Sequence, residues 1–158
     1  MKKTHLLVVS ALRQNARMKL TEMTRQVRVP VSSIFDMLRS FESRGIIRKY
    51  SAIVRFGYFG FNAHALLLLS VVKKDRERLL DYLGRSQNVN SIYQVNNGWD
   101  FMVEVVFPGV REVEDFLVDM DGVLNLKERK VLYIVDELKK ECFLSSPELM
   151  RLNGGEGL

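Results

Sequence analysis

Apolar residues change their spacing at Gly45, and this change constrains the fold more than any other feature of the chain. Before Gly45 they recur at the spacing of helices that bury one face. After Gly45 they alternate with polar residues or run together over the length of a strand. The sequence therefore predicts a helical first module, a second module built around a sheet, and an α+β fold.

Three short helices are predicted in the first module, at residues 4–15, about 20–27 and 30–44. Pro30 suits the first turn of the third helix, where its missing N–H would have no partner in any case. Gly45 suits the left-handed position just past a helix end. The tight connection between the second and third helices predicts a helix-turn-helix, with a generic three-helix bundle as the alternative.

The third helix is predicted to have one buried face and one polar face. Ile34, Leu38 and Phe41 follow an i, i+4, i+7 spacing and form the buried stripe. The opposite face carries Ser32, Asp36, Arg39, Ser40 and Ser43. If this helix binds DNA, side chains near its N-terminal end would meet base edges and flanking residues would hold phosphates.

The second module is predicted to have the ferredoxin-like order β-α-β-β-α-β. The predicted elements are a strand at 63–72, a helix at 73–85, strands at 89–95 and 99–107, a helix at 110–120 and a strand at 123–135. Leu79, Leu80 and Leu83 are predicted to form the apolar side of the first of these helices.

Between the modules, the segment "IIRKYSAIVRF" at 46–56 is rich in residues that favour strands, and the segment "GYFGFN" that follows is typical of a hinge. The predicted boundaries are a helix-turn-helix domain at 1–49, a linking strand and hinge at 50–61, a ferredoxin-like domain at 62–142, and a C-terminal tail at 143–158. The Gly-rich end of that tail, residues 153–158, is predicted to be disordered.

Charge is divided unequally between the two parts of the chain. Residues 1–61 hold 12 Lys and Arg but three acids, whereas residues 62–158 hold 12 Lys and Arg and 16 Asp and Glu. The net charges of these parts are therefore +9 and −4, which together give the +5 of the whole chain. A basic first module indicates a polyanionic partner, most often nucleic acid. The alternative interpretation is that the basic residues are only a solvated face.

Membrane, secreted and metal-dependent classes receive no support from the sequence. The longest apolar run, residues 63–69, is far too short to span a bilayer, and no signal peptide is predicted. One cysteine, Cys142, excludes an internal disulfide and fits a cytoplasmic location. His5 and His64 do not have the spacing of a zinc site, so no metal site is predicted. No cofactor and no catalytic residue are predicted either.

Two polar residues stand in otherwise apolar strands of the second module. His64 is predicted to be a residue with a satisfied hydrogen bond or part of an interface. Glu104 is predicted to pair either across a dimer or with Arg129, and no catalytic role is assigned to it.

Two segments resemble the Lrp/AsnC family of transcription regulators, also called feast/famine proteins. The first, "SALRQNARMKLTEMTRQVRVPVSSIFDMLRSFESRGIIRKYSAIV", is similar to the family's winged-type helix-turn-helix and its linking strand. The second, "YQVNNGWDFMVEV", is similar to a strand-loop-strand that carries a Gly and an aromatic–Asp pair in the family. With the order of the modules, the resemblance covers roughly residues 4–142.

The resemblance implies a DNA-binding transcriptional regulator with an N-terminal winged-type helix-turn-helix domain and a ferredoxin-like domain. It also implies a homodimer built through the second domain, often assembled into a higher oligomer, and a small effector that is usually an amino acid. The chain departs from the family at Asp36 and Met37, where two basic residues are common, and at Pro30, where Ser is common. It departs again at Asn97-Gly98, where the family often has Gly and then Asp.

Eight residues form the predicted DNA-binding set. The short serines would let the helix approach the duplex, and Arg39 would reach a guanine edge or a phosphate. Asp36 is predicted to pair with Arg39, three residues on, in preference to accepting a hydrogen bond from cytosine. The set is Arg28, Ser32, Ser33, Asp36, Arg39, Ser40, Arg44 and Arg48.

A predicted effector-binding set lies around the loop at residues 96–100. Amides of this loop suit a carboxylate, Asp100 suits an ammonium group, and Trp99 could form a wall. The alternative is a hairpin turn with Trp99 in the core. By resemblance, Leu132, Tyr133 and Ile134 would face the loop. The set is Asn96, Asn97, Gly98, Trp99, Asp100 and Tyr133.

Two other functions remain open. A basic architectural protein would bind DNA broadly without an effector. Enzymes of the same architecture decarboxylate tetrapyrroles and carry His residues near the central strands, whereas this chain has only His64 in that module. The sequence therefore favours a regulator over an enzyme.

Overall fold

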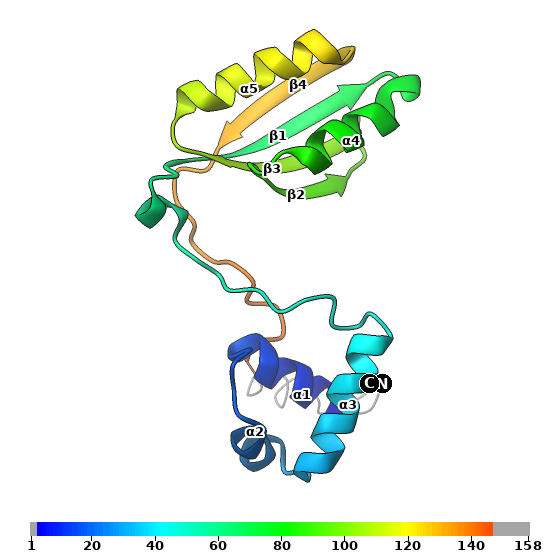
Figure 1. The fold of residues 1–158 in the computed structure, drawn as a ribbon, viewed down its shortest axis with the longest axis vertical. Helices are drawn as coiled ribbons and strands as arrows, with labels where there is room; N and C mark the ends of the chain where they lie inside the picture. The colour runs from blue at the N-terminus through cyan, green and yellow to red at the C-terminus, as the bar shows by residue number, and fades with distance from the viewer. Residues whose placement is uncertain (1–2, 147–158) are drawn as a thin grey trace. The chain divides into compact units, whose positions relative to one another are not determined.

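The computed structural model describes residues 3–146 (Figure 1). Within them the chain forms two compact units: the first contains residues 3–53 and 138–146, and the second contains residues 54–137. None of the described helices is both long and apolar enough to cross a membrane. The predicted disorder at residues 153–158 falls outside the described residues.

The first unit contains the three predicted helices, α1 (Lys3–Gln14), α2 (Leu20–Val27) and α3 (Val31–Ser43). Each contributes its apolar stripe to one small core, and the half-buried Leu38 packs against it. The buried members of this core are Val8, Ala11, Met23, Val27, Ile34 and Phe41. The helical spacing in the sequence therefore identified the three helices and the buried stripe of α3 at Ile34 and Phe41.

The connection between α2 and α3 is short and sharply bent. Arg28 adopts a left-handed conformation with φ of 60°, and its N–H donates to the Thr24 carbonyl at 2.8 Å. Pro30 lies immediately before α3, and its carbonyl accepts the N–H of Ile34 at 3.1 Å. Gly45 has φ of +66° just past the helix, as predicted, which is a conformation that side chains disfavour.

The linking strand predicted within residues 50–61 is not formed, and neither is a strand in the β-rich stretch 46–56. This stretch has no strand assignment, and Ile46, Tyr50 and Ile53 are at least half exposed. A strand requires a neighbouring strand for its backbone hydrogen bonds, and among the described residues of this single chain no strand pairs with it. The segment has a β-rich composition, but composition alone does not supply a partner strand.

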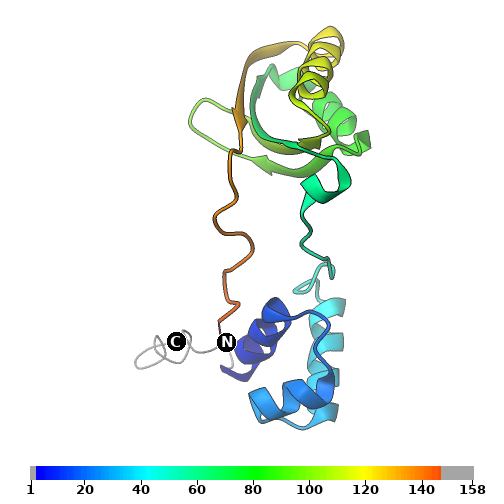
Figure 2. The ribbon, with the colours of Figure 1, turned by 90° about the vertical axis from the view of Figure 1, so that its left-hand side faces the viewer.

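The second unit has the predicted β-α-β-β-α-β order. Its elements are β1 (Ala63–Val71), α4 (Arg76–Arg85), β2 (Val89–Gln94), β3 (Phe101–Phe107), α5 (Val110–Val123) and β4 (Leu126–Tyr133), with 3-10 turns η1 (Phe56–Phe59) and η2 (Lys73–Asp75). The strands form one antiparallel sheet in the order β2-β3-β1-β4. Figure 2 shows α4 and α5 on the same side of this sheet.

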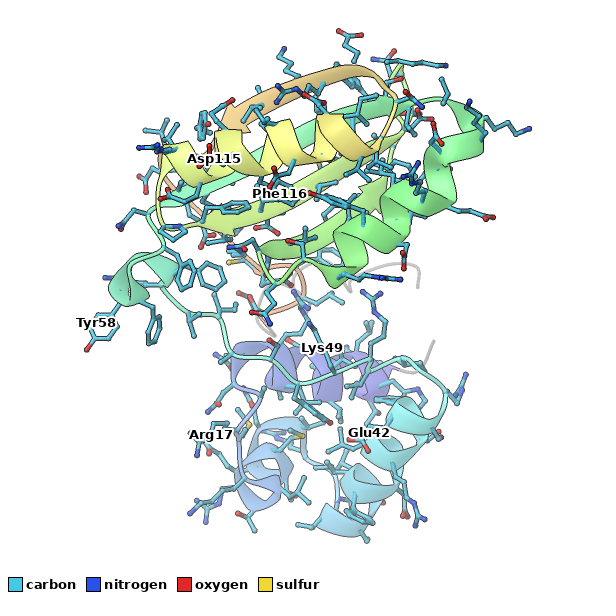
Figure 3. The ribbon with its side chains drawn as sticks, turned by 45° about the horizontal axis from the view of Figure 1, so that its top comes forward. Arg17, Glu42, Lys49, Tyr58, Asp115 and Phe116 are labelled. Carbon is cyan, nitrogen blue, oxygen red and sulfur yellow. The ribbon has the colours of Figure 1, made fainter. Side chains whose placement is uncertain are left out.

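The core of the second unit lies between the sheet and the two helices. Alternate residues of β1 are buried, and they meet Leu79 and Leu83 of α4 and Leu117 of α5. Phe116, labelled in Figure 3, contacts the rings of Tyr82 and Phe107 at centroid distances of 5.7 and 5.3 Å. Each fully buried large side chain contributes about 1.5–3 kcal/mol to folding.

The prediction that Leu80 lies on the apolar side of α4 is wrong. Its side chain is 41% exposed, whereas Leu79 and Leu83 are fully buried. Adjacent helical residues diverge by about 100°, so a residue next to the i, i+4 stripe can point to solvent.

The other face of the sheet is not covered by a described helix. Leu66 and Leu68 of β1 lie there, opposite Leu132 of β4 and Met102 of β3 respectively. These side chains are half-buried or exposed within the single chain. These apolar side chains lie beside Glu104, which is opposite Leu66, and Lys130, which is opposite Leu68. A partly apolar sheet face of this kind is suited to pack against another protein surface.

Glu104 is a buried acid on that same face and is 9% exposed. Its carboxylate is 2.7 Å from Nε2 of His64, and it accepts hydrogen bonds from Asn90 at 2.7 Å and Ser91 at 2.9 Å. The alternative of a pair with Arg129 is wrong, because Nε of Arg129 pairs with a carboxylate of α5 at 3.1 Å. The prediction that His64 has a satisfied hydrogen bond is confirmed.

Candidate functional site

The polar face of α3 is open to solvent. Ile34 and Phe41 are buried on the opposite side, which turns Asp36 and Arg39 outward. Of the eight predicted DNA-binding residues, Ser40 is half-buried and the others are exposed. The exposed ones are Arg28, Ser32, Ser33, Asp36, Arg39, Arg44 and Arg48.

Exposed cations lie in the segments before and after α3. Arg25 and Arg28 lie on α2 and at its end, and Arg17 and Lys49 are labelled in Figure 3. Within the described residues, none of these cations is held in an ion pair; the recorded pair of the first unit joins Arg13 to Glu141. Cations without an acidic partner can neutralise phosphates without first breaking a pair.

The predicted pair between Asp36 and Arg39 is not formed among the described residues. Both side chains are exposed, and a helical pair of exposed charges gains only about 0.3–0.5 kcal/mol while it restricts two mobile side chains. Asp36 therefore remains a negative charge on the outward face of α3.

Phe35 and Val31 are features of α3 that the sequence analysis missed. Phe35 is 54% exposed and Val31 is 39% exposed, although Ile34 between them is fully buried. A helical projection from Ile34 would have placed both side chains at the edge of the buried stripe. The exposed surface of α3 is therefore apolar along one edge and polar along its centre.

The loop between β2 and β3 is a tight hairpin turn. Asn97 and Gly98 have φ values of 62° and 90°, and the N–H of Val95 donates to the Asp100 carbonyl at 3.1 Å. Positive φ at both central residues is typical of a type I′ turn. Asn96, Asn97 and Gly98 are exposed and Trp99 is half-buried, so the turn presents its amides to solvent.

Asp100 is engaged within the chain. Its carboxylate accepts hydrogen bonds from the backbone N–H of Val71 at 2.9 Å and from the Ser70 hydroxyl at 3.4 Å. It also forms an ion pair with Arg76, the first residue of α4, at 2.7 Å. The carboxylate therefore ties the loop to the end of β1 and the start of α4.

These partners stabilise the charged form of Asp100. The Val71 N–H is the main cause that holds the pKa of this carboxyl below its ordinary value of 3.8, and partial burial opposes it. The charges of Arg76 and Lys127 lower the pKa further. An effector ammonium group would have to compete with these contacts, so the structure changes the role that the sequence suggested for Asp100.

Tyr133 does not lie beside this loop within one copy of the chain. It pairs with Ala65 on β1, whereas the N–H of Asp100 donates to Leu69, four residues farther along that strand. Four residues of strand correspond to about 13 Å. The Tyr133 hydroxyl donates to Glu114 of α5 at 3.0 Å. The structure thus brings together five of the six predicted effector residues, those at 96–100. It places the sixth, Tyr133, elsewhere on the sheet.

Comparison with known proteins identifies relatives along most of the chain. No protein-family model matches the sequence. An uncharacterized HTH-type transcriptional regulator of Pyrococcus abyssi is 29% identical over 141 aligned residues, which are 86% of this chain and 91% of the relative. The HTH-type transcriptional regulator LrpC of Bacillus subtilis is 24% identical, over 70% of this chain and 76% of its own length.

Solved structures share the fold. The structure of B. subtilis LrpC superposes with a TM-score of 0.79 at 21% identity, and covers 88% of this chain and 97% of LrpC. A transcriptional regulator of Neisseria meningitidis in complex with L-Met has a TM-score of 0.81 at 20% identity, over 89% of this chain and 93% of that chain.

The chain is similar over most of its length to HTH-type transcriptional regulators, and it shares its helix-turn-helix and ferredoxin-like sheet with solved structures of such proteins. The comparisons confirm the resemblance to the Lrp/AsnC regulators that the sequence predicts, and the fold is theirs.

The engagement of Asp100 predicts a pH-dependent contribution to stability. At neutral pH, Asp100→Asn should lower the free energy of unfolding by about 1.5–3 kcal/mol, the range for hydrogen bonds to a charged group. Because the folded pKa lies below the ordinary value of 3.8, this contribution is complete above that value and is lost as pH falls through the folded pKa. Urea unfolding, followed by the fluorescence of Trp99, measures it.

The matched control is Asp81→Asn, which removes an exposed i, i+4 pair with Arg85. It should change the stability by less than about 0.5 kcal/mol at any pH. Equal effects of the two substitutions, or a cost of Asp100→Asn that persists in acid, would contradict this role of Asp100.

Proposed function

We propose that this chain is a transcriptional regulator that binds double-stranded DNA through α3, assembles through the sheet of its second unit and responds to a small effector. The observation that carries the proposal is the outward polar face of α3, together with exposed cations before and after this helix that form no ion pair among the described residues. The relatives are regulators, so we propose no catalytic step, and we expect the protein to act in the cytoplasm.

DNA binding would begin with phosphate contacts. The first turn of α3 has no side-chain cap, because Pro30 precedes it and offers no side-chain acceptor. Its amides can therefore bind a phosphate, aided by the positive end of the helix dipole. Arg28, Arg44 and Arg48 would add phosphate contacts that weaken with salt. Arg39 would contact a guanine edge or a further phosphate from the middle of the helix.

A homodimer would present two copies of α3 to the duplex. The uncovered sheet face supports this assembly, because Leu66, Leu68 and Leu132 are apolar and are not covered by a described helix. Two recognition helices of such a dimer would enter successive major grooves about 34 Å apart. The preferred DNA site would then be close to palindromic. Further assembly of dimers into a larger oligomer belongs to the same proposal.

The effector site would be the loop at residues 96–100, and its ligand would be a small molecule such as an amino acid. The exposed amides of Asn96 and Asn97 can donate to a carboxylate, and the half-buried Trp99 can wall the ligand. The solved complex of the N. meningitidis regulator with L-Met supports an amino-acid ligand. Because Asp100 is engaged, the ammonium group would require acceptors from a second copy, where Tyr133 could also take part. Binding would then shift the assembly and with it the DNA affinity.

A second candidate is an architectural protein that binds DNA broadly and has no effector. It is favoured by the shortage of base-reading side chains on α3, whose polar face carries short serines and the acid Asp36. Phosphate contacts alone give affinity without sequence preference.

Charge changes on α3 should alter DNA affinity in opposite directions. Arg39→Ala should weaken binding and, if the contact is to phosphate, lower the slope of log affinity against log salt by about 1. Asp36→Arg should strengthen binding to duplexes of any sequence, because it replaces a repulsive charge on the groove side. Fluorescence anisotropy with a labelled duplex over a range of salt concentrations measures both.

Arg111→Ala is the control, because it removes an equally exposed cation from α5 in the second unit. It should leave the affinity and the salt slope unchanged. If Arg39→Ala and Asp36→Arg behave like Arg111→Ala, α3 does not contact DNA.

An effector should change the emission of Trp99, which is the single tryptophan of the chain. Titration with each amino acid, starting with L-Met, should give a saturable change for at least one of them. Asn97→Gly keeps the left-handed turn but removes the side-chain amide, and should weaken binding about tenfold. Asn15→Gly in the first unit should have no effect. If no amino acid changes either the Trp99 emission or the DNA affinity, the architectural function is favoured.

A further inference from the structure

Phe35 is an exposed aromatic residue on a helix whose residues Ile34 and Phe41 are buried. It is 54% exposed, whereas Ile34 is fully buried and Phe41 is 3% exposed. Met37 and Leu38 pack against the core of the first unit, but Phe35 is not a member of that cluster. The stability of the unit therefore does not explain an aromatic residue at this position.

The surroundings of Phe35 form a short strip along α3. Val31 precedes it by four residues and is 39% exposed, and the exposed Arg39 follows it by four residues. Residues four apart are neighbours on a helix surface. The strip is thus apolar in the first half of α3, ends in a guanidinium group, and runs beside Ser32 on the polar face.

We propose that Phe35 is a specificity-determining residue that contacts the C5-methyl group of a thymine in the major groove. This inference rests on the proposed DNA-binding function and adds a base preference to it. The thymine methyl is the apolar group that the major groove displays, and apolar side chains such as Phe are suited to contact it. Val31 would complete the apolar surface around that methyl group.

The charge around the strip favours DNA over an apolar protein as the occupant. Arg28, Arg39 and Arg44 are exposed, and none of them is held in an ion pair within the described residues. An apolar partner that covered Phe35 would leave these cations without counter-charges. A duplex supplies a methyl group at the floor of the groove and phosphates along both edges.

The helix geometry also limits where the thymine lies. Four helical residues span about 6 Å along the axis, which is close to the rise of two base pairs. The thymine contacted by Phe35 should therefore lie within about two base pairs of the base pair that Arg39 contacts.

The test replaces thymine by deoxyuridine, which lacks only the methyl group. Duplexes that bind the full-length protein are first selected from a random-sequence pool, and each thymine is then exchanged singly. Loss of one buried methyl contact should weaken binding about fourfold at one thymine in each half-site, and leave the other positions unaffected. The phosphates are unchanged, so the salt slope should stay the same.

Substitution of Phe35 assigns the effect to this side chain. With Phe35→Ala, deoxyuridine at that position should no longer weaken binding, whereas Phe35→Leu should keep part of the discrimination. The control is Phe59→Ala, which truncates a 64% exposed Phe of the second unit. It should distinguish thymine from deoxyuridine as strongly as the unmodified protein does.

The outcomes separate this inference from the function on which it rests. Salt-dependent DNA binding that is indifferent to deoxyuridine at every position would overturn the role of Phe35 and leave the regulator function standing. Discrimination that survives in Phe35→Ala would also overturn it. If the unmodified protein binds no duplex in low salt, both the inference and the proposed function fail.

Discussion

Burial of Ile34 and Phe41 fixes the rotation of α3 about its own axis, and the proposed function depends on that rotation. Both side chains point into the core of the first unit, where they are 0% and 3% exposed. Together they contribute about 3–6 kcal/mol, so a rotated helix would lose much of the stability of a unit this small. With this stripe held inward, Ser32 and Arg39 must point outward. The bend at Arg28 then sets where α3 starts after α2.

The second unit uses a comparable constraint at its loop. The carboxylate of Asp100 binds the end of β1 and the start of α4, so the turn at Asn97 and Gly98 projects from a fixed base. A charge-assisted network of this kind positions the exposed amides without using them. The loop is therefore anchored at its foot and exposed at its tip, as the proposed effector site requires.

Local patterns in the sequence predicted the helices, the order of the elements along the chain and the inner face of α3, because these follow from spacing along the sequence. Interactions between distant residues were not predictable in the same way. The partner of Glu104 is His64 because the register of β1 on β3 brings them together, and no local pattern encodes that register. The segment at 46–56 has the composition of a strand, but pairing requires a second strand. For the proposed site residues, the exposure of those on α3 was predictable from the sequence. The ion pair between Asp100 and Arg76 was not.

Amide hydrogen exchange of the full chain, with and without a duplex selected from random-sequence DNA, tests the central claim most directly. The uncapped amides at the start of α3 should exchange quickly in the free protein and slowly in the complex. Protection should extend over residues 28–40, and α4 and α5 should be unchanged. Unaltered exchange at residues 28–40, with DNA-dependent protection confined to the second unit, would contradict the account.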